Sequence, residues 1–199
     1  MAAPRLVGFD GAWASVLVGS GHDPLASVAA VGWLVDGAFA GVVLGDDGTV
    51  TPLPGLIGSP EGLLGRRSGL LSAVRDQPTS WTSPTAFLWP HDRPDGTHGH
   101  VRVTVFRFSA GSVGGVHGVV VLSPPPDLRG LTGRELEVLG HMLDGSSNDQ
   151  IARALVVTSR TIATHVEHIL LKLSSPSRTH AAVRAQREGL YVAPSAPSC

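Results

Sequence analysis

The sequence predicts a two-domain chain, with an N-terminal α+β module followed by an all-α unit of four short helices. Three observations predict this division. β-rich stretches lie in the first 123 residues, helix-capping patterns gather after residue 130, and three consecutive prolines separate the two regions. We therefore expect a first domain at 1–123, a linker at 124–130, a helical domain at 131–192 and a flexible tail at 193–199.

The N-terminal domain shows the residue patterns of strands in a central sheet. Alternating or β-branched residues run through Ala38–Leu44, Val101–Phe108 and Val116–Leu122, and a glycine-rich turn joins the last two stretches. The segment "GDDG" after the first stretch has the residues of a turn between strands. The stretches 12–17 and 23–34 are more helical in pattern, which completes an antiparallel α+β module.

A stretch of aromatic and histidine residues from Trp81 to His100 is expected to form a loop. Its aromatic side chains could line a ligand pocket, and the His-x-His pattern of His98 and His100 could bind a metal. Neither a cysteine nor a fixed helical spacing supports a metal site there. We favour a polar loop with a few core aromatics, and we expect no metal and no cofactor.

The composition restricts the setting of the chain. Its 199 residues are 42% hydrophobic and 16% charged, enough for one ordinary core or two small ones, of which we favour two. The net charge of −1 argues against a tail that coats nucleic acid or an anionic membrane. The single cysteine, Cys199, excludes an internal disulfide, and no apolar run approaches the ~20 residues that cross a bilayer. We expect a cytoplasmic protein without membrane contact.

Charge is divided unevenly between the two domains. Residues 1–127 carry seven arginines and ten acidic residues, whereas residues 128–199 carry eight basic and six acidic residues. The C-terminal domain is therefore the better anion binder.

Four helix starts can be read in the C-terminal domain. Each is marked by a hydroxyl side chain that can accept from the free amides of a first turn: Thr132, Ser147, Thr158, and either Ser177 or Thr179. Glu135 and Gln150 complete the first two as capping boxes. None of these short helices can bury its apolar stripe alone, so they share one core. Its expected members are Leu136, Leu139, Ile151, Leu155, Ile162, Val166 and Leu173.

The second and third helices are separated by only a few residues and form a helix-turn-helix. When its apolar stripe turns inward, the third helix leaves an outer face of Arg160, Ala163, Thr164, Glu167, His168 and Leu171. Thr158, Ser159 and Arg160 stand at its N-terminus, where unpaired amides and a partial positive charge suit a phosphate. A helix of this diameter fits the major groove of B-DNA.

The segment from Leu131 to Val183 resembles the LuxR-type (GerE-like) four-helix DNA-binding domain of bacterial transcriptional regulators. The resemblance rests on four motifs: Leu-Thr-x-Arg-Glu-x-Glu-Val-Leu, Ser-Asn-x-x-Ile-Ala, Thr-x-x-x-His-Val, and Lys-Leu followed by Ser-Arg-Thr. It implies that the helix from Ser159 to Leu173 enters the major groove and that the fourth helix often pairs two protomers on a two-fold site. The implied DNA contacts are Thr158, Ser159, Arg160, Ala163, Thr164, Glu167, His168, Lys172 and Arg178.

Two departures from this family pattern bear on DNA affinity. The family frequently places basic residues where this chain has Ala163 and Glu167, so fewer cations face the phosphates. Glu167 either lies on a solvated face or accepts a hydrogen bond from a cytosine amino group. Gly133 and Ser174 also differ from the pattern, as structural adjustments.

The resemblance implies a bacterial transcription regulator. By analogy with regulators of this architecture, residues 1–123 suit a GAF- or PAS-like sensor module that controls a DNA-binding homodimer, with a small-molecule effector as a candidate ligand. The alternative is a protein-interaction or signalling module whose four helices pair with a partner protein and do not bind DNA.

Three other functions find less support. A phosphoacceptor receiver domain needs a lysine, and the only lysine, Lys172, lies in the helical domain. A homoserine-lactone pocket uses Trp, Tyr and Asp, and the only tyrosine, Tyr191, lies outside the N-terminal domain. No nucleophile elbow, dinucleotide pattern or Walker loop is complete, so we expect no enzyme activity.

Overall fold

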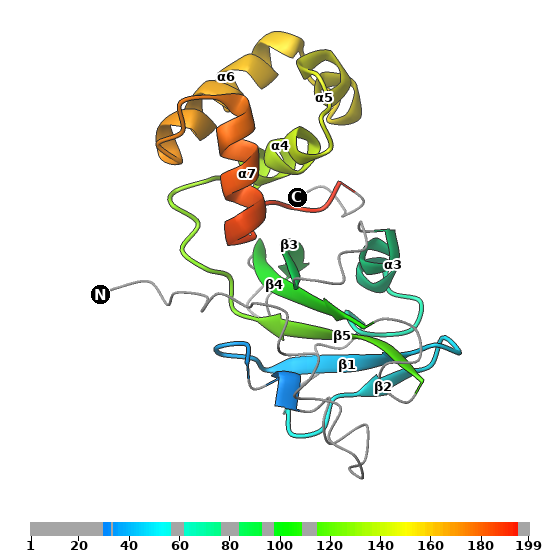
Figure 1. The fold of residues 1–199 in the computed structure, drawn as a ribbon. Coiled ribbons are helices and arrows are strands. Elements are labelled where there is room, and N and C mark those ends of the chain that lie inside the picture. The colour runs from blue at the N-terminus through cyan, green and yellow to red at the C-terminus, as the bar shows by residue number, and fades with distance from the viewer. Residues whose placement is uncertain are drawn as a thin grey trace.

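The computed structural model describes residues 30–32, 34–56, 62–76, 84–92, 98–108 and 115–194, and within them a five-stranded antiparallel sheet forms the centre of the N-terminal part (Figure 1). The strands, in the spatial order β2-β1-β5-β4-β3, are β1 (Ala40–Gly45), β2 (Val50–Pro52), β3 (Thr85–Asp92), β4 (His98–Arg107) and β5 (Val116–Ser123). The three strands predicted from the sequence are confirmed as β1, β4 and β5, with ends shifted by up to three residues.

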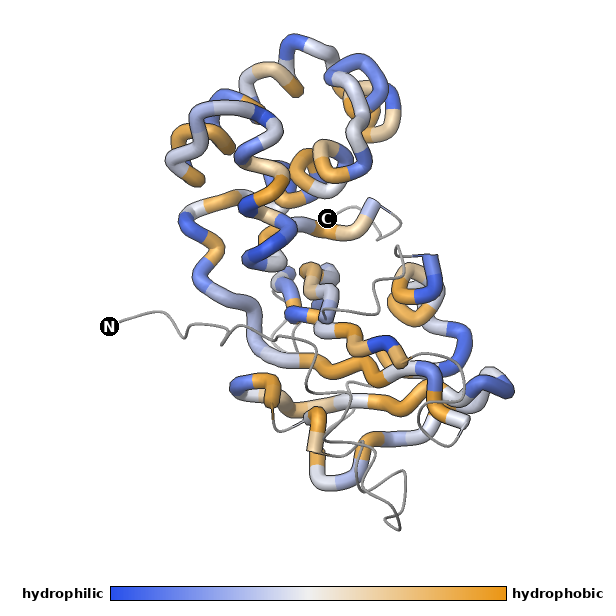
Figure 2. The backbone as a smooth tube through the Cα atoms, viewed as in Figure 1, coloured by the Kyte–Doolittle hydropathy of each residue, from blue (hydrophilic) through white to orange (hydrophobic). Residues whose placement is uncertain are grey.

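Alternation along the strands divides the apolar side chains between the two faces of the sheet. Val42 and Leu122 belong to the core that contains helix α3 (Gly69–Asp76), whereas Val43 and Val121 belong to a second core on the opposite face. Both faces are buried, so β5 is a nearly continuous apolar run. Figure 2 shows hydrophobic residues concentrated along the strands at the centre of this sheet.

Strand β3 corrects the expectation of a loop between Trp81 and His100. Residues 85–92 pair with β4 along their whole length, and Phe87 and Trp89 are buried. Pro90 favours a loop in the sequence because proline cannot donate to a sheet ladder, but β3 lies at the sheet edge, where that loss is tolerated.

The proposed His-x-His metal pattern falls on the start of β4. The Nδ1 atom of His98 lies 2.6 Å from a carboxylate oxygen of Asp92 across the β3–β4 hairpin. Within the part of the chain that the structure describes, no group of three or more metal-ligating side chains gathers.

The turn between β1 and β2 confirms the predicted role of "GDDG". The carboxylate of Asp47 accepts from the Thr49 amide at 2.9 Å, and Gly48 adopts the positive φ of 78° that glycine tolerates. The expected helical stretch at 12–17 lies outside the described residues, as does most of 23–34, of which residues 30–32 are helical. No helix among the described residues is long and apolar enough to cross a membrane.

Four helices follow the proline-rich segment, namely α4 (Gly133–Leu143), α5 (Asn148–Ala154), α6 (Ser159–Lys172) and α7 (Arg178–Glu188). Thr132 and Ser147 form both predicted capping boxes. Thr158 and Ser177 cap the other two helices by accepting from the amide three residues on, which settles the fourth cap in favour of Ser177.

The helical core has the composition expected from the apolar stripes. Five of the seven predicted members are completely buried: Leu136, Leu139, Ile151, Ile162 and Leu173. Leu155 is 8% exposed, and Val166 is half-buried at the edge of the core. The stripe of α6 that contains Ile162 and Leu173 therefore faces α4, and its opposite side is left to solvent.

The helical unit and the sheet share one hydrophobic core, so the expectation of two separate cores is wrong at this junction. After α7 the chain runs through Leu190, Tyr191, Val192 and Ala193, each at most 4% exposed, between β3 and α4 (Figure 1). Tyr191, which the sequence places outside the N-terminal domain, packs its ring against Phe87 of β3 with 6.4 Å between ring centroids.

Candidate nucleic-acid interface

Helix α6 begins at a hydroxyl cap on the molecular surface. The Thr158 hydroxyl accepts from the Thr161 amide at 3.1 Å. Ser159 is half-buried and donates its hydroxyl to Asp149, which ties the start of α6 to α5. Arg160, the next residue, is exposed. The cap satisfies one amide of the first turn, and the others have no acceptor within the helix, so this end of α6 suits an anion.

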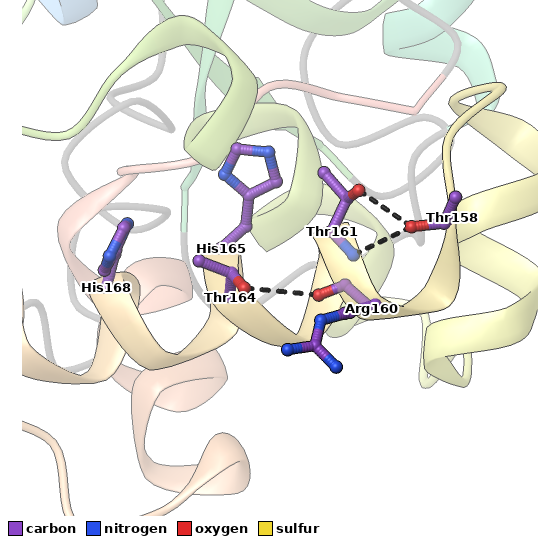
Figure 3. A pocket seen from close by; sticks show the side chains of 6 residues that line it. All are labelled: Thr158, Arg160, Thr161, Thr164, His165 and His168. Atoms are coloured by element: carbon purple, nitrogen blue, oxygen red, sulfur yellow. Dashed lines mark hydrogen bonds between the residues drawn. The ribbon is translucent and has the colours of Figure 1, made fainter.

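A shallow hollow runs along the outer side of α6 (Figure 3). It is lined by Thr158, Arg160, Thr161, Thr164, His165 and His168. The Thr164 hydroxyl donates to the carbonyl of Arg160 at 3.3 Å, while the Arg160 guanidinium projects away from the helix. Four of these six residues are among the implied DNA contacts.

Thr161 and His165 are the two lining residues that the implied contacts omit. Together with Thr164 and His168 they form a stripe at helical spacings of three and four residues. That spacing is visible in the sequence, so the helical period alone could have found them.

A second strip of α6 lies beside the hollow and has a different character. Ala163, Glu167 and Leu171 follow one another at intervals of four residues, so they share one side of the helix. Glu167 is exposed, Ala163 is half-buried and Leu171 is 77% exposed. This strip therefore presents one acid and one large apolar side chain to solvent. The family pattern frequently has basic residues at two of its positions, those of Ala163 and Glu167.

Lys172, at the end of α6, is paired with an acid of α4. Its Nζ lies 2.7 and 2.9 Å from the two carboxylate oxygens of Glu135, whose side chain is 3% exposed. The Thr132 amide also donates to Glu135, at 2.7 Å. Burial alone would raise the pKa of Glu135, but the hydrogen bonds from Lys172 and Thr132 outweigh it and lower that pKa. This pair fixes α6 on α4.

His168 extends the same contact. Its Nδ1 lies 3.9 Å from a Glu135 oxygen, while its side chain is 55% exposed beside the hollow. The carboxylate of Glu135 thus lies beneath two of the implied DNA contacts, His168 and Lys172. The sequence marks Glu135 only as part of a capping box, because its partners are 33 and 37 residues away.

Arg178 joins the start of α7 to the start of α5. One guanidinium nitrogen donates to Asn148 at 2.8 Å, and another donates to the carbonyl of Ser146. Arg134 does the same for the end of α5, since it donates to the Leu155 carbonyl at 2.7 Å and to Glu137 at 2.6 Å. Both arginines hold α5 in place at the base of α6.

The turn between α5 and α6 contains Val156 in a left-handed conformation, with φ of 55° and 89% of its surface exposed. A β-branched residue rarely adopts this conformation because its side chain crowds the backbone. The turn is therefore strained, and Val156 contributes almost no packing in return.

The two short helices α5 and α6, packed on α4 with the outer face of α6 free, define a helix-turn-helix of the DNA-binding class. Residues 129–185 match the family model described as bacterial regulatory proteins of the luxR family. This segment therefore contains the LuxR-family helix-turn-helix that its sequence motifs implied.

Curated relatives match through the same region. The chain is 39% identical over 75 residues to the transcriptional regulatory protein LnrK of Bacillus subtilis and 45% identical over 60 residues to LiaR of the same organism. These matches cover 38% and 30% of this chain, and 34% and 28% of LnrK and LiaR. A 57-residue match to the regulator MalT of Yersinia pestis, 47% identical, covers 29% of this chain and 6% of MalT. The chain thus spans about a third or less of the length of these relatives.

Among solved structures, the chain is similar to VqmA of Vibrio cholerae, described as a LuxR-type receptor. The TM-score is 0.42 at 16% identity, over 89% of this chain and 92% of that one. A structure of VqmA bound to DPO gives a TM-score of 0.39 at 19% identity, over 83% and 88% of the two chains.

Proposed function

We propose that this chain is a cytoplasmic bacterial transcription regulator that binds double-stranded DNA as a homodimer under the control of its N-terminal domain. We propose no enzyme activity for it. The observation that carries the proposal is the free outer face of α6 on a LuxR-family domain: Arg160, Thr164, Glu167 and His168 are exposed on a helix that is anchored from below through Glu135.

The proposed contacts fall into two groups. Thr158, Ser159 and Arg160 meet a phosphate at the N-terminus of α6, where the helix dipole favours an anion. The groove face then places Ala163, Thr164, Glu167 and His168 against base edges. In this arrangement the base contacts carry the sequence specificity and the phosphate contacts carry much of the affinity.

Lys172 and Arg178 are proposed as flanking phosphate contacts. Their charged groups already bind Glu135 and the start of α5, so a phosphate would be an additional acceptor for them. We expect Arg160, which is exposed at the helix start, to contribute more to phosphate binding than either of these two residues.

The N-terminal domain is proposed to be a sensor module with a small-molecule effector. Support comes from its strand-rich fold and from its direct contact with the helical unit at Tyr191. A ligand there can change DNA binding only by binding one arrangement of the two parts more tightly than another.

The second candidate function is a protein-interaction module, and one observation favours it. The strip with Glu167 and the 77% exposed Leu171 offers an acid and an apolar side chain to a partner, where DNA would favour cations.

Selection from a random duplex library on the full-length chain separates the two functions. A DNA regulator enriches a defined sequence with two-fold symmetry, because a symmetric dimer reads two half-sites. If the chain is folded by circular dichroism and enriches no sequence, the proposal of DNA binding fails and the interaction module takes its place.

A further inference from the structure

We propose that residues Leu190–Ala193 form a strap that holds the N-terminal sheet against the helical unit. Through this strap, a displacement of the sheet is transmitted to α4. The strap is the chain's own segment, docked on the free edge of β3. The inference that the strap acts on DNA binding through α6 rests on the proposed function. The docking of the strap between β3 and α4 does not.

The free edge of β3 accepts this segment at Leu88. The Leu88 amide donates to the Tyr191 carbonyl at 2.8 Å, and Leu88 forms a parallel bridge with Val192. Successive amides of an edge strand point alternately into and away from the sheet, so Leu88 points outward and Pro90, two residues on, has no amide to offer. This edge therefore offers an outward amide at Leu88 and none at Pro90.

The other side of the strap binds α4. The Val192 amide donates to the Leu136 carbonyl at 3.1 Å. Gly140, one turn further along α4, lies so close that a Cβ atom there would stand 2.0 Å from the Val192 carbonyl oxygen. Glycine is a poor residue in a helix interior, and here its missing side chain makes room for the strap.

Side chains close the junction around these bonds. The Tyr191 ring packs on Phe87. Gly189, at the end of α7 with φ of 68°, lies so near β3 that a Cβ atom there would stand 3.1 Å from the Cβ of Ala86. Burial raises the pKa of Tyr191 to about 12, with a further contribution from Asp144. Its phenol therefore stays neutral inside the junction.

Consecutive contacts connect the strap to α6 through α4. It binds Leu136 and adjoins Gly140 on α4, and the same helix carries Glu135, whose carboxylate binds Lys172 of α6. A shift of β3 would thus move the strap, α4 and the anchor of α6 together. The proline-rich segment 124–126 provides a second connection between the parts, but no bond of this chain of contacts passes through it.

The substitution Gly140→Ala tests the strap because it should stabilise α4 and displace the strap. Alanine favours the helix α4, while its methyl group collides with the Val192 carbonyl and must displace the strap. Gly65→Ala is the matched control, since a methyl group there meets nothing closer than 3.7 Å. A same-length Gly/Ser replacement of Pro124–Pro126 is the control for the linker.

Amide hydrogen exchange of the full chain is the readout, at Leu88 and at its neighbour Phe87, which lies inside the β3–β4 ladder. We expect Gly140→Ala to accelerate exchange at Leu88 on the order of tenfold or more while Phe87 stays protected, with both controls unchanged. Tyr191→Ala, which removes the ring contact with Phe87 and leaves the sequence of α4 unchanged, should give the same pattern.

Two results would overturn the strap. One is unchanged exchange at Leu88 in both variants, and the other is equal acceleration at Leu88 and Phe87, which would mean that β3 itself unfolds. Neither readout uses DNA, so a failed strap and a failed DNA-binding proposal are told apart.

Discussion

Lys172 of α6 lies 2.7 Å from a carboxylate oxygen of Glu135 in α4, and the Glu135 side chain is almost fully buried. The pair joins α6 to α4, across 37 residues of sequence. It also holds the one lysine of the chain against α4, with its side chain only partly exposed.

Removal of one partner should cost stability because it leaves the other charge buried without a counter-ion. We expect Lys172→Met to lower the free energy of unfolding by about 2 kcal/mol, below the cost of breaking a fully buried pair because Lys172 is partly exposed. Urea denaturation measures it. The double variant Glu135→Gln, Lys172→Met should recover part of the loss, and a single variant as stable as the wild type would contradict the role of this pair.

The same pair predicts how stability depends on pH. Because the folded-state pKa of Glu135 lies below its ordinary value of 4.5, its contribution is fully present above that pH and is lost as pH falls through the lowered pKa. The stability difference between the wild type and Glu135→Gln should therefore shrink below pH 4.5. Denaturation curves of both proteins across an acidic series test this, and a difference that stays constant with pH would exclude the carboxylate as its source.

The strained turn at Val156 predicts a stabilising substitution. Val156→Gly should raise the free energy of unfolding by about 1 kcal/mol, since relief of a strained left-handed residue outweighs the added freedom of glycine in the unfolded chain. Val156→Ala keeps a Cβ in the same conformation and should gain less. Thermal unfolding compares the three proteins, and a lower midpoint for Val156→Gly would show that the turn is not strained.

Base contacts from the outer face of α6 predict a change in sequence preference. Thr164→Ala or Glu167→Gln should alter which duplexes are enriched from a random library more than they alter affinity for random DNA, because base contacts discriminate by about 1–3 kcal/mol per pair. Leu34→Ala, at an exposed position in the N-terminal part, is the control. Identical enriched sequences before and after substitution would remove these residues from the base-reading set.

The helical unit was predictable because its information is local. Thr132 and Ser147 cap helices through residues three positions away, and the apolar stripe of α6 repeats within the helix itself. The anchor of α6 was not predictable, because Glu135 and Lys172 meet only after three helices have packed. The sequence shows that both residues are charged but not that they face each other.

The edge strand β3 and the strap could not be predicted from the sequence. A proline argues against a central strand because it cannot donate to the sheet ladder. Pro90 is tolerated because β3 lies at the sheet edge, which the local sequence does not reveal. The sequence predicts residues 190–192 as the end of the helical domain and Ala193 as the start of a flexible tail, whereas all four residues are buried. Their burial depends on β3 and α4, which are distant in sequence, and local patterns carry no signal of that contact.

Contact between α6 and DNA can be measured from the salt dependence of DNA binding by Arg160→Ala. If Arg160 contacts a phosphate, its loss should weaken binding to specific and random duplexes alike, by roughly 1–2 kcal/mol, and reduce the slope of log affinity against log salt by about one unit. Arg187→Ala, an exposed arginine in the last turn of α7, should change neither quantity. Fluorescence anisotropy of the full-length proteins across a salt series gives both. Equal slopes for the wild type and Arg160→Ala would contradict a phosphate contact at the start of α6.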